Sequence, residues 1–218
     1  IYIPEYQYHK QNLQIRYFEF TVNPSFKMEY VYKNPEYNWS WFALSGKKDL
    51  KLDLVIQNPS KNWLFHQIYA RKDLDFNNYI LKYQNFNWDF HLLSKNSSID
   101  IHVISKLSDK DWDWNILSNI YLYKLKIIEK YSNLPWKWHI ISYSCNLTIP
   151  FLEKLLDKKW NWFQISTTIQ IPIEFILKYP NKDYDWNRIR MTSLNMNINN
   201  LKKCLHLPLN WYNVSRCK

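Results

Sequence analysis

Four phrases of seven residues share one pattern and return along the chain at a nearly constant interval. WSWFALS, WDWNILS, WKWHIIS and WNWFQIS each place two aromatic residues one position apart, followed by an aliphatic residue and a serine. The second aromatic position recurs after 24 or 25 residues and is occupied by Trp41, Phe65, Phe90, Trp114, Trp138, Trp162, Trp186 and Trp211. A unit this short cannot bury its apolar face alone, so consecutive units must stack. The period therefore restricts the chain to repeat architectures.

Other columns of the alignment keep the same period. The first aromatic position is occupied by Trp39, Trp63, Trp88, Trp112, Trp136, Trp160, Tyr184 and Leu209. The aliphatic position is occupied by Leu44, Ile68, Leu93, Leu117, Ile141, Ile165, Ile189 and Val214. A ninth, degenerate unit is indicated upstream by Ile15, Tyr17, Phe20 and Thr21. The repeat thus fills essentially the whole chain.

A second element precedes each aromatic phrase. Eight residues before the first aromatic, the column holds only aliphatic residues: Val31, Val55, Ile80, Ile104, Ile128, Leu152, Ile176 and Leu201. The column three residues further upstream is also apolar, with Asn77 as its one polar member. Spacing of three predicts an amphipathic helix of roughly ten residues. Pro150 and Pro172 fall near its start, where a missing N–H costs least.

The aromatic phrase itself predicts a short helical turn, for which a 3₁₀ conformation is one option. We expect Asn62, Asn87, Asp111 and Asp183 to cap such turns. The expected fold is an all-α solenoid of about nine units, forming a single repeat domain over 1–218. Residues 1–38 hold the degenerate N-terminal unit, 39–208 the regular repeats and 209–218 a partial C-terminal unit. The tryptophans then fill the space between layers; the alternative is an exposed aromatic ladder that stacks nucleic-acid bases.

The phrases WDWNILS, IPIEFILKYP and NPEYNWSW resemble the tandem tryptophan-rich repeats of proteins from large nucleocytoplasmic DNA viruses. The match covers almost the full chain and implies a viral source, without a catalytic activity. In period, the chain is also loosely similar to the leucine-rich variant repeats, which implies a right-handed α-solenoid. This chain lacks the clustered cysteines of an iron–sulfur member of that group, so no cluster is expected.

Lysine dominates the column six residues before the first aromatic. Its members are Lys33, Lys82, Lys106, Lys130, Lys154, Lys178 and Lys203, with Gln57 as the one exception. The formal net charge of the chain is +10, so most of its excess positive charge belongs to this lysine column. Stacking would align the lysines along one edge, where they could bind an acidic protein surface or nucleic-acid phosphates. Alternatively, they complement helix C-termini and lay their stems over neighbouring aromatic rings.

Composition and spacing argue against a catalytic or metal centre. The single glycine, Gly46, leaves no phosphate loop or nucleophile elbow, which both need glycine. The recurring serines, such as Ser118 and Ser215, have no histidine partner that recurs with them, so we expect them to satisfy backbone groups. Successive layers would hold His66, His91 and His139 too far apart to share a metal, so we expect a partly exposed edge there.

The functional prediction is a non-catalytic scaffold that binds a protein partner, as a viral structural or host-interaction protein. The alternative is a nucleic-acid-binding solenoid that places the lysine column on phosphates, and a third option is an adaptor for a catalytic domain elsewhere in a longer polypeptide. We expect no cofactor, small-molecule substrate or membrane partner. Three cysteines without a C-x-x-C pair indicate a reducing compartment, here the virion or host cytoplasm.

Overall fold

The computed structural model describes residues 17–189, 198–210 and 212. Within these residues the chain is all-helical, and no β-strand is present. The chain divides into two compact units, unit 1 (Ile1–Val103) and unit 2 (Ile104–Lys218), which are described separately below. The sequence prediction of a single repeat domain over 1–218 stays a prediction. Predicted positions at Ile15, Trp211, Val214 and Ser215 lie outside the described residues.

In the described part of the chain, six consecutive repeats contain two α-helices, here called the first and the second helix. In the repeat of α14, residues 186–188 form a turn in place of the second helix. The first helices of unit 1 are α2 (Glu29–Lys33), α4 (Leu52–Gln57) and α6 (Phe76–Lys82), and α8 (Ile101–Lys106) contains the boundary between the units. Those of unit 2 are α10 (Leu125–Lys130), α12 (Ile149–Lys154), α14 (Ile173–Lys178) and α15 (Ile198–Cys204). Residues 17–22 are also helical.

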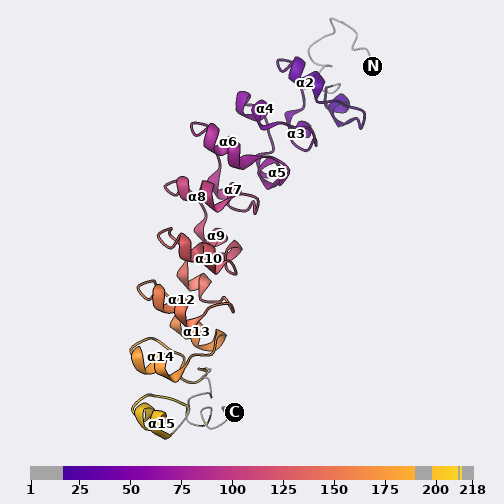
Figure 1. Ribbon diagram of the computed structural model, residues 1–218. Helices are drawn as coiled ribbons and strands as arrows, with labels where there is room; N and C mark the ends of the chain where they lie inside the picture. Colours follow the sequence, from indigo (N-terminus) through magenta and orange to yellow (C-terminus); the bar gives the residue numbers. More distant parts are fainter. Residues whose placement is uncertain (1–16, 190–197, 211, 213–218) are drawn as a thin grey trace, which may run out of the picture. The chain divides into compact units, whose positions relative to one another are not determined.

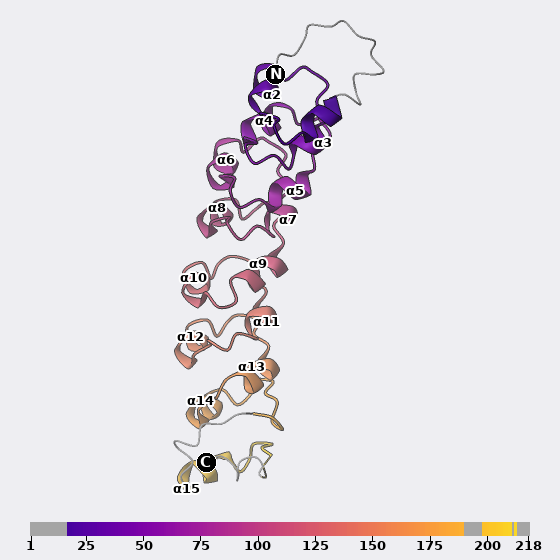
Figure 2. The same cartoon turned by 90° about the vertical axis from the view of Figure 1, so that its right-hand side faces the viewer.

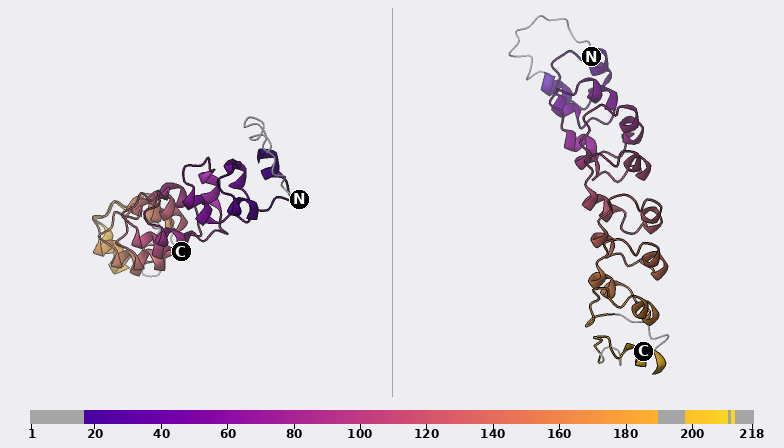
Figure 3. Two further views of the ribbon diagram at one scale, coloured as in Figure 1. Left: turned by 90° about the horizontal axis from the view of Figure 1, so that it is seen from above. Right: turned by 90° about the vertical axis from the view of Figure 1, so that its left-hand side faces the viewer.

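The second helices begin at the second aromatic of each phrase. They are α3 (Trp41–Leu44), α5 (Phe65–Ala70) and α7 (Phe90–Leu93) in unit 1. In unit 2 they are α9 (Trp114–Ile120), α11 (Trp138–Ile141) and α13 (Trp162–Thr168). Within unit 1, α5 packs against α7, and within unit 2, α9 packs against α11 and α14 against α15. Figure 2 and the right-hand view of Figure 3 show two rows of helices within each unit: the first helices lie in one row and the second helices lie in the other.

The first helix is shorter than the roughly ten residues expected, and α14, for example, has six. The residues on both sides leave helical geometry: Pro172 before α14 is extended, and Tyr179 after it has φ −129° and ψ 58°. The predicted place of the prolines is confirmed, because Pro150 lies in the first turn of α12 and Pro172 is the N-cap of α14. Leu52, Leu125 and Ile149, from the upstream apolar column, are the first residues of their helices. The aromatic phrase carries a true α-helix of up to seven residues, so the 3₁₀ option is not needed.

The predicted capping residues are wrong by two positions. Asn62, Asn87 and Asp111 lie just before the first aromatic, whereas the N-cap of each second helix lies between the two aromatics. Side chains of Ser40, Asp89, Asp113 and Asn161 accept backbone N–H bonds there. In the repeat of Asp183, the same role falls to Asp185, which accepts from the N–H groups of Asn187 and Arg188. The first aromatic therefore stays outside the helix.

The predicted apolar columns form the core of both units. Fully buried members of the two aliphatic columns include Val31, Leu44, Ile68, Ile80, Leu93, Ile104, Ile128, Ile141, Leu152, Ile165 and Ile176. Asn77, the polar exception, does not enter the core, because Phe76 takes the buried place beside it. The Asn77 side chain instead donates to the carbonyl of Ser98 and accepts from the N–H of Asp100. No helix among the described residues is long and apolar enough to cross a lipid bilayer.

Candidate functional site

The first aromatic of each phrase is buried and donates one recurring hydrogen bond. Its indole N–H reaches the backbone carbonyl five residues earlier, at the end of the first helix. The donors are Trp39, Trp63, Trp88, Trp112, Trp136 and Trp160, with N···O distances of 2.7–2.9 Å. Tyr184 replaces tryptophan in one repeat, and its hydroxyl donates to the equivalent carbonyl of Tyr179 at 3.1 Å. Seven of the eight positions in the column thus hold a large ring with a donor at its tip, and Leu209 fills the eighth as an apolar core residue.

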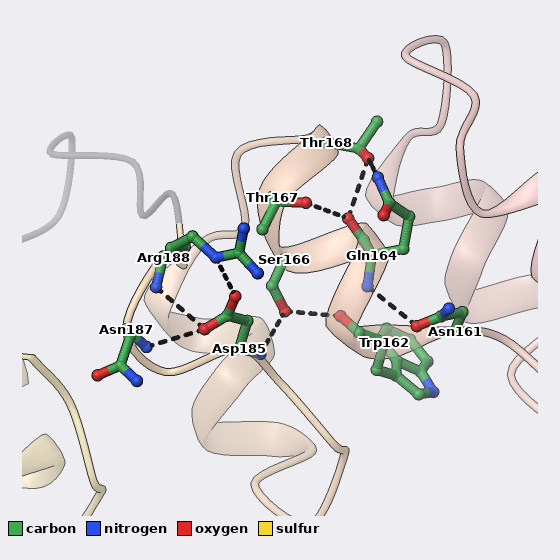
Figure 4. Close-up of polar contacts among 9 residues, drawn as sticks. All are labelled: Asn161, Trp162, Gln164, Ser166, Thr167, Thr168, Asp185, Asn187 and Arg188. Carbon is green, nitrogen blue, oxygen red and sulfur yellow. Dashed lines mark hydrogen bonds and ion pairs between the residues drawn. The ribbon is translucent and has the colours of Figure 1, made fainter.

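The recurring serine links one repeat to the next. Ser142 Oγ donates to the carbonyl of Trp138 at 2.8 Å and accepts from the backbone N–H of Asn161, nineteen residues on, at 2.9 Å. Ser166 makes the same pair of bonds to Trp162 and Asp185 (Figure 4). The expected role in satisfying backbone groups is confirmed. Because these serines are fully buried, each joins two consecutive repeats where water has no access.

In unit 1, Ser45 makes this link to Trp41 and Leu64, while the following repeat has Tyr69 in the serine position. Tyr69 is 2 % exposed, and its hydroxyl accepts from the backbone N–H of Asp89. Burial raises the pKa of Tyr69 to about 12, since the phenolate would be poorly solvated. Tyr69 therefore accepts a hydrogen bond from the next repeat, as the serine does elsewhere, but it does not make the serine's bond to the carbonyl four residues earlier.

Neighbouring aromatic rings and lysine side chains cover the ring faces of several tryptophans. The second aromatic of one repeat meets the first of the next edge-to-face, with centroids 4.9 Å apart for both Trp41–Trp63 and Trp138–Trp160. Lysine ammonium groups cover some of these rings: Lys61 lies over Trp41, Lys158 over Trp138 and Lys182 over Trp162. These tryptophans are thus core residues with little face exposed for stacking on bases.

The lysine column lies at the ends of the first helices, as expected. Lys33, Lys82, Lys106, Lys130, Lys154 and Lys178 are the last residues of α2, α6, α8, α10, α12 and α14, and Lys203 lies in the last turn of α15. All seven side chains are exposed. A cation at this end complements the helix dipole. Whether the column also binds an acidic partner or phosphates stays a prediction.

Three lysines of the column lie over the aromatic ring that follows them. Nζ to ring-centroid distances are 4.8 Å for Lys82 and Tyr83, 5.2 Å for Lys130 and Tyr131, and 5.1 Å for Lys178 and Tyr179. The interaction with Tyr83 raises the pKa of Lys82. These rings hold the ammonium groups in place at the helix ends while leaving them in contact with water.

In unit 2, two lysines of the column also pair with a glutamate of the preceding repeat. Lys154 Nζ lies 2.6 Å from Glu129 Oε1, and Lys178 Nζ lies 2.8 Å from Glu153 Oε1. The Glu153 carboxylate raises the pKa of Lys178. In unit 1, the carboxylate of Asp53 instead accepts hydrogen bonds from the hydroxyls of Tyr79 and Tyr83. Repeats of unit 2 are therefore linked along this edge by charge, and those of unit 1 by phenols.

The histidine column lies on an exposed edge, as predicted. His66, His91 and His139 are exposed, and Phe42 and Phe163 occupy the same position in other repeats with 57 % and 49 % exposure. Within the described part of the chain, no three His, Cys, Asp or Glu residues lie close enough to hold a metal ion. The recurring serines face backbone groups and the next repeat.

Sequence reasoning missed the indole hydrogen bonds of the tryptophans and the capping residues. A signal for the caps was present, because the position between the two aromatics holds Ser40, Asp89, Asp113, Asn161 and Asp185. The pairs Glu129–Lys154 and Glu153–Lys178 are both separated by 25 residues, which also repeats the period of the chain.

Comparison with known proteins does not assign this chain to a family. No family model, curated protein or solved structure matches the chain. Its role must therefore be inferred from the two surfaces that the repeats create: an edge of exposed lysines at the ends of the first helices, and an edge of aromatic, histidine and amide side chains on the second helices.

Proposed function

We propose that this chain is a non-catalytic repeat scaffold, a right-handed α-solenoid of about nine units, that holds an acidic protein partner along its lysine column. The observation that carries the proposal is the recurrence of an exposed lysine at the last residue of α2, α6, α8, α10, α12 and α14. A recurring row of exposed cations within each unit favours a partner with a complementary acidic surface.

The burial of the tryptophans supports a protein partner over nucleic acid. A surface that binds single-stranded nucleic acid combines basic groups with aromatic rings on which bases stack. Here the indoles of the first aromatic column and those of Trp41, Trp114, Trp138 and Trp162 in the second lie in the core, while Trp186 is partly exposed. Lysines cover the rings of Trp41, Trp138 and Trp162. The alternative of a nucleic-acid-binding solenoid rests on the lysines alone. The resemblance to viral tryptophan-rich repeats extends the proposal to a viral structural or host-interaction protein, located in the virion or the host cytoplasm.

Charge reversal with a matched control tests this proposal. One variant changes Lys82, Lys106, Lys130, Lys154 and Lys178 to Glu. The control changes five other exposed lysines, Lys48, Lys72, Lys95, Lys159 and Lys202, to Glu, which gives the same net charge. We expect proteins captured by the wild-type chain, identified by mass spectrometry, to be lost with the first variant and retained with the control.

Thermal unfolding of the same two variants separates binding from stability. Partner binding that persists while the melting temperature falls would mean that the lysines serve only the helix ends. Fluorescence anisotropy with labelled single-stranded and duplex nucleic acid tests the alternative at two salt concentrations. Affinity that survives physiological salt would favour the nucleic-acid function over the scaffold.

A further inference from the structure

The positive charge of unit 2 is not evenly distributed over its first helices. Helix α12 carries one glutamate and one lysine, and so does α14. Helix α10, with the sequence LKIIEK, carries Lys126, Lys130 and one glutamate, and Lys124 is its N-cap. Lys126 and Lys130 are four residues apart and therefore lie on one face of the helix. Among these three helices, α10 has the largest excess of positive charge.

The one acidic residue of α10, Glu129, already forms an ion pair within the chain. The Glu129 carboxylate binds Lys154 of the next repeat at 2.6 Å. Lys178 is likewise held by Glu153. Of the column lysines on α10, α12 and α14, two thus face carboxylates of the chain itself, and Lys130 faces the ring of Tyr131 instead. An incoming acidic group would meet less competition at α10 than at α12 or α14.

A shallow hollow lies beside this helix. Its volume is about 350 Å³, and it is lined by Tyr123, Lys124, Leu125, Lys126, Ile127 and Asn146. The lining contains two lysines and no carboxylate, so its charge favours an anion. Tyr123 is 62 % exposed, and Leu125 and Ile127 are partly exposed beside it, so the same hollow offers apolar surface. Lys124 is held over the buried ring of Tyr121 at 4.9 Å.

We infer that this hollow in unit 2 receives a short acidic segment of a protein partner, with a carboxylate side chain on Lys124 and Lys126 and an adjacent apolar side chain against Tyr123. The inference rests on the proposed scaffold function and names where, and by what chemistry, the partner is recognised. A hollow that pairs cations with apolar walls selects for acidic–apolar sequence, whereas lysines alone would bind any polyanion. The helix face shared by Lys126 and Lys130 makes the hollow continuous with the lysine column.

Fluorescence anisotropy with defined peptides tests this inference. The probe is a labelled peptide in which Glu and Leu alternate, compared with a Glu–Ser peptide of the same length and with labelled duplex DNA. We expect the Glu–Leu peptide to bind the wild-type chain, Lys126→Glu to weaken its affinity by about tenfold and Tyr123→Ala by a smaller factor. The Glu–Ser peptide should bind more weakly, because it lacks a group for the apolar wall.

Lys159→Glu is the matched control, because Lys159 is exposed, lies outside the hollow and the lysine column, and produces the same change in net charge. It should retain wild-type affinity for the peptide. Both altered side chains of the hollow are exposed, so circular dichroism should show unchanged folding.

Unchanged peptide affinity in Lys126→Glu and Tyr123→Ala would overturn the inference, and so would equal binding of the Glu–Ser peptide or binding of duplex DNA alone. This failure can be told apart from failure of the scaffold proposal. The scaffold proposal fails when the five-lysine variant still captures the protein partner, which is a separate measurement with a different ligand.

Discussion

The two units share the buried-serine link between consecutive repeats, but each adds different polar groups to it. In unit 1, a row of side chains eight residues after the first aromatic donates to the backbone of the preceding repeat: Lys47 to Asn23, Arg71 to Lys47, and Asn96 to Arg71, each to a carbonyl oxygen. In unit 2, the same position holds Ile120, Ser144 and Thr168. There the buried serines and the Lys–Glu pairs link consecutive repeats.

This difference shows which parts of the repeat are constrained and which can vary. The indole donor and the aliphatic columns are present in both units, because the end of every first helix leaves a carbonyl that must be satisfied and every layer needs an apolar centre. The polar links vary, because several side chains can satisfy a carbonyl at the edge of a layer. Experiments on matched positions in the two units can therefore separate shared from local contributions.

The largest effect is expected from the shared tryptophans. Trp136→Ala in unit 2 and Trp63→Ala in unit 1 should each lower the free energy of unfolding by about 3–5 kcal/mol, because both remove a buried ring and leave a carbonyl without its donor. Trp136→Tyr should cost less than Trp136→Phe, since Tyr184 already shows that a hydroxyl can replace the indole N–H. Urea denaturation followed by circular dichroism measures these values. Equal losses for Tyr and Phe would contradict the role of the donor.

The serine links come next. Ser142→Ala removes the donor to Trp138 and the acceptor for the N–H of Asn161, and should cost about 1–3 kcal/mol because both groups are buried. Hydrogen exchange should show faster exchange at the Asn161 amide. Ser132→Ala is the control, because Ser132 makes no hydrogen bond, and it should stay within about 0.5 kcal/mol of wild type. A Ser142→Ala variant as stable as this control would show that the serine link does not stabilise the contact between repeats.

The carbonyl row of unit 1 is tested at Arg71. Its guanidinium donates to the carbonyls of Lys47 and Lys48 at 2.8 and 2.9 Å, and pairs with Asp73. Arg71→Ala should cost about 1–2 kcal/mol, because these are charge-assisted bonds at a partly exposed site. Hydrogen exchange should change in residues of unit 1 and not at the serine-linked amides of unit 2. Equal changes in both units would show that the row does not act locally.

Tyr69 makes one link between repeats of unit 1 dependent on pH. Its pKa rises to about 12 in the folded chain from an ordinary value near 10, so its contribution is complete below about pH 10 and is lost as pH rises through about 12. Tyr69→Phe should cost about 1 kcal/mol at neutral pH, because the N–H of Asp89 loses its acceptor. The gap between variant and wild type should narrow above pH 10. A constant gap up to pH 12 would show that Tyr69 does not titrate in this range.

The smallest effect is expected for the ion pairs of unit 2. Glu129→Gln should cost less than about 1 kcal/mol, since both Glu129 and Lys154 are substantially exposed, and the difference should disappear in high salt. Asp183→Asn serves as the control, because Asp183 is exposed and has no ion-pair partner. A salt-independent loss at Glu129 would point to a packing role for its side chain.

The aromatic phrase and the aliphatic columns predicted most of the core, because residues that face the centre of every layer must be apolar in every repeat. The same reasoning located the lysines at the helix ends. It misplaced the caps, because Asn62, Asn87 and Asp111 are as suitable chemically as the residues two positions on. Only the geometry showed that the first aromatic stays outside the helix and turns its N–H back to the carbonyl five residues earlier.

By itself, the sequence determined the all-α class, the period, the core columns and the place of the lysines, since each follows from spacing along the chain. The tertiary structure alone decided the links between repeats. Lys47, Arg71 and Asn96 share no chemical type that a column would reveal, and their common partner is backbone carbonyl oxygen, which every residue carries. The hollow beside α10 likewise depends on Asn146, which lines it from the next repeat, and contacts across repeats are set by packing and not by spacing along the chain.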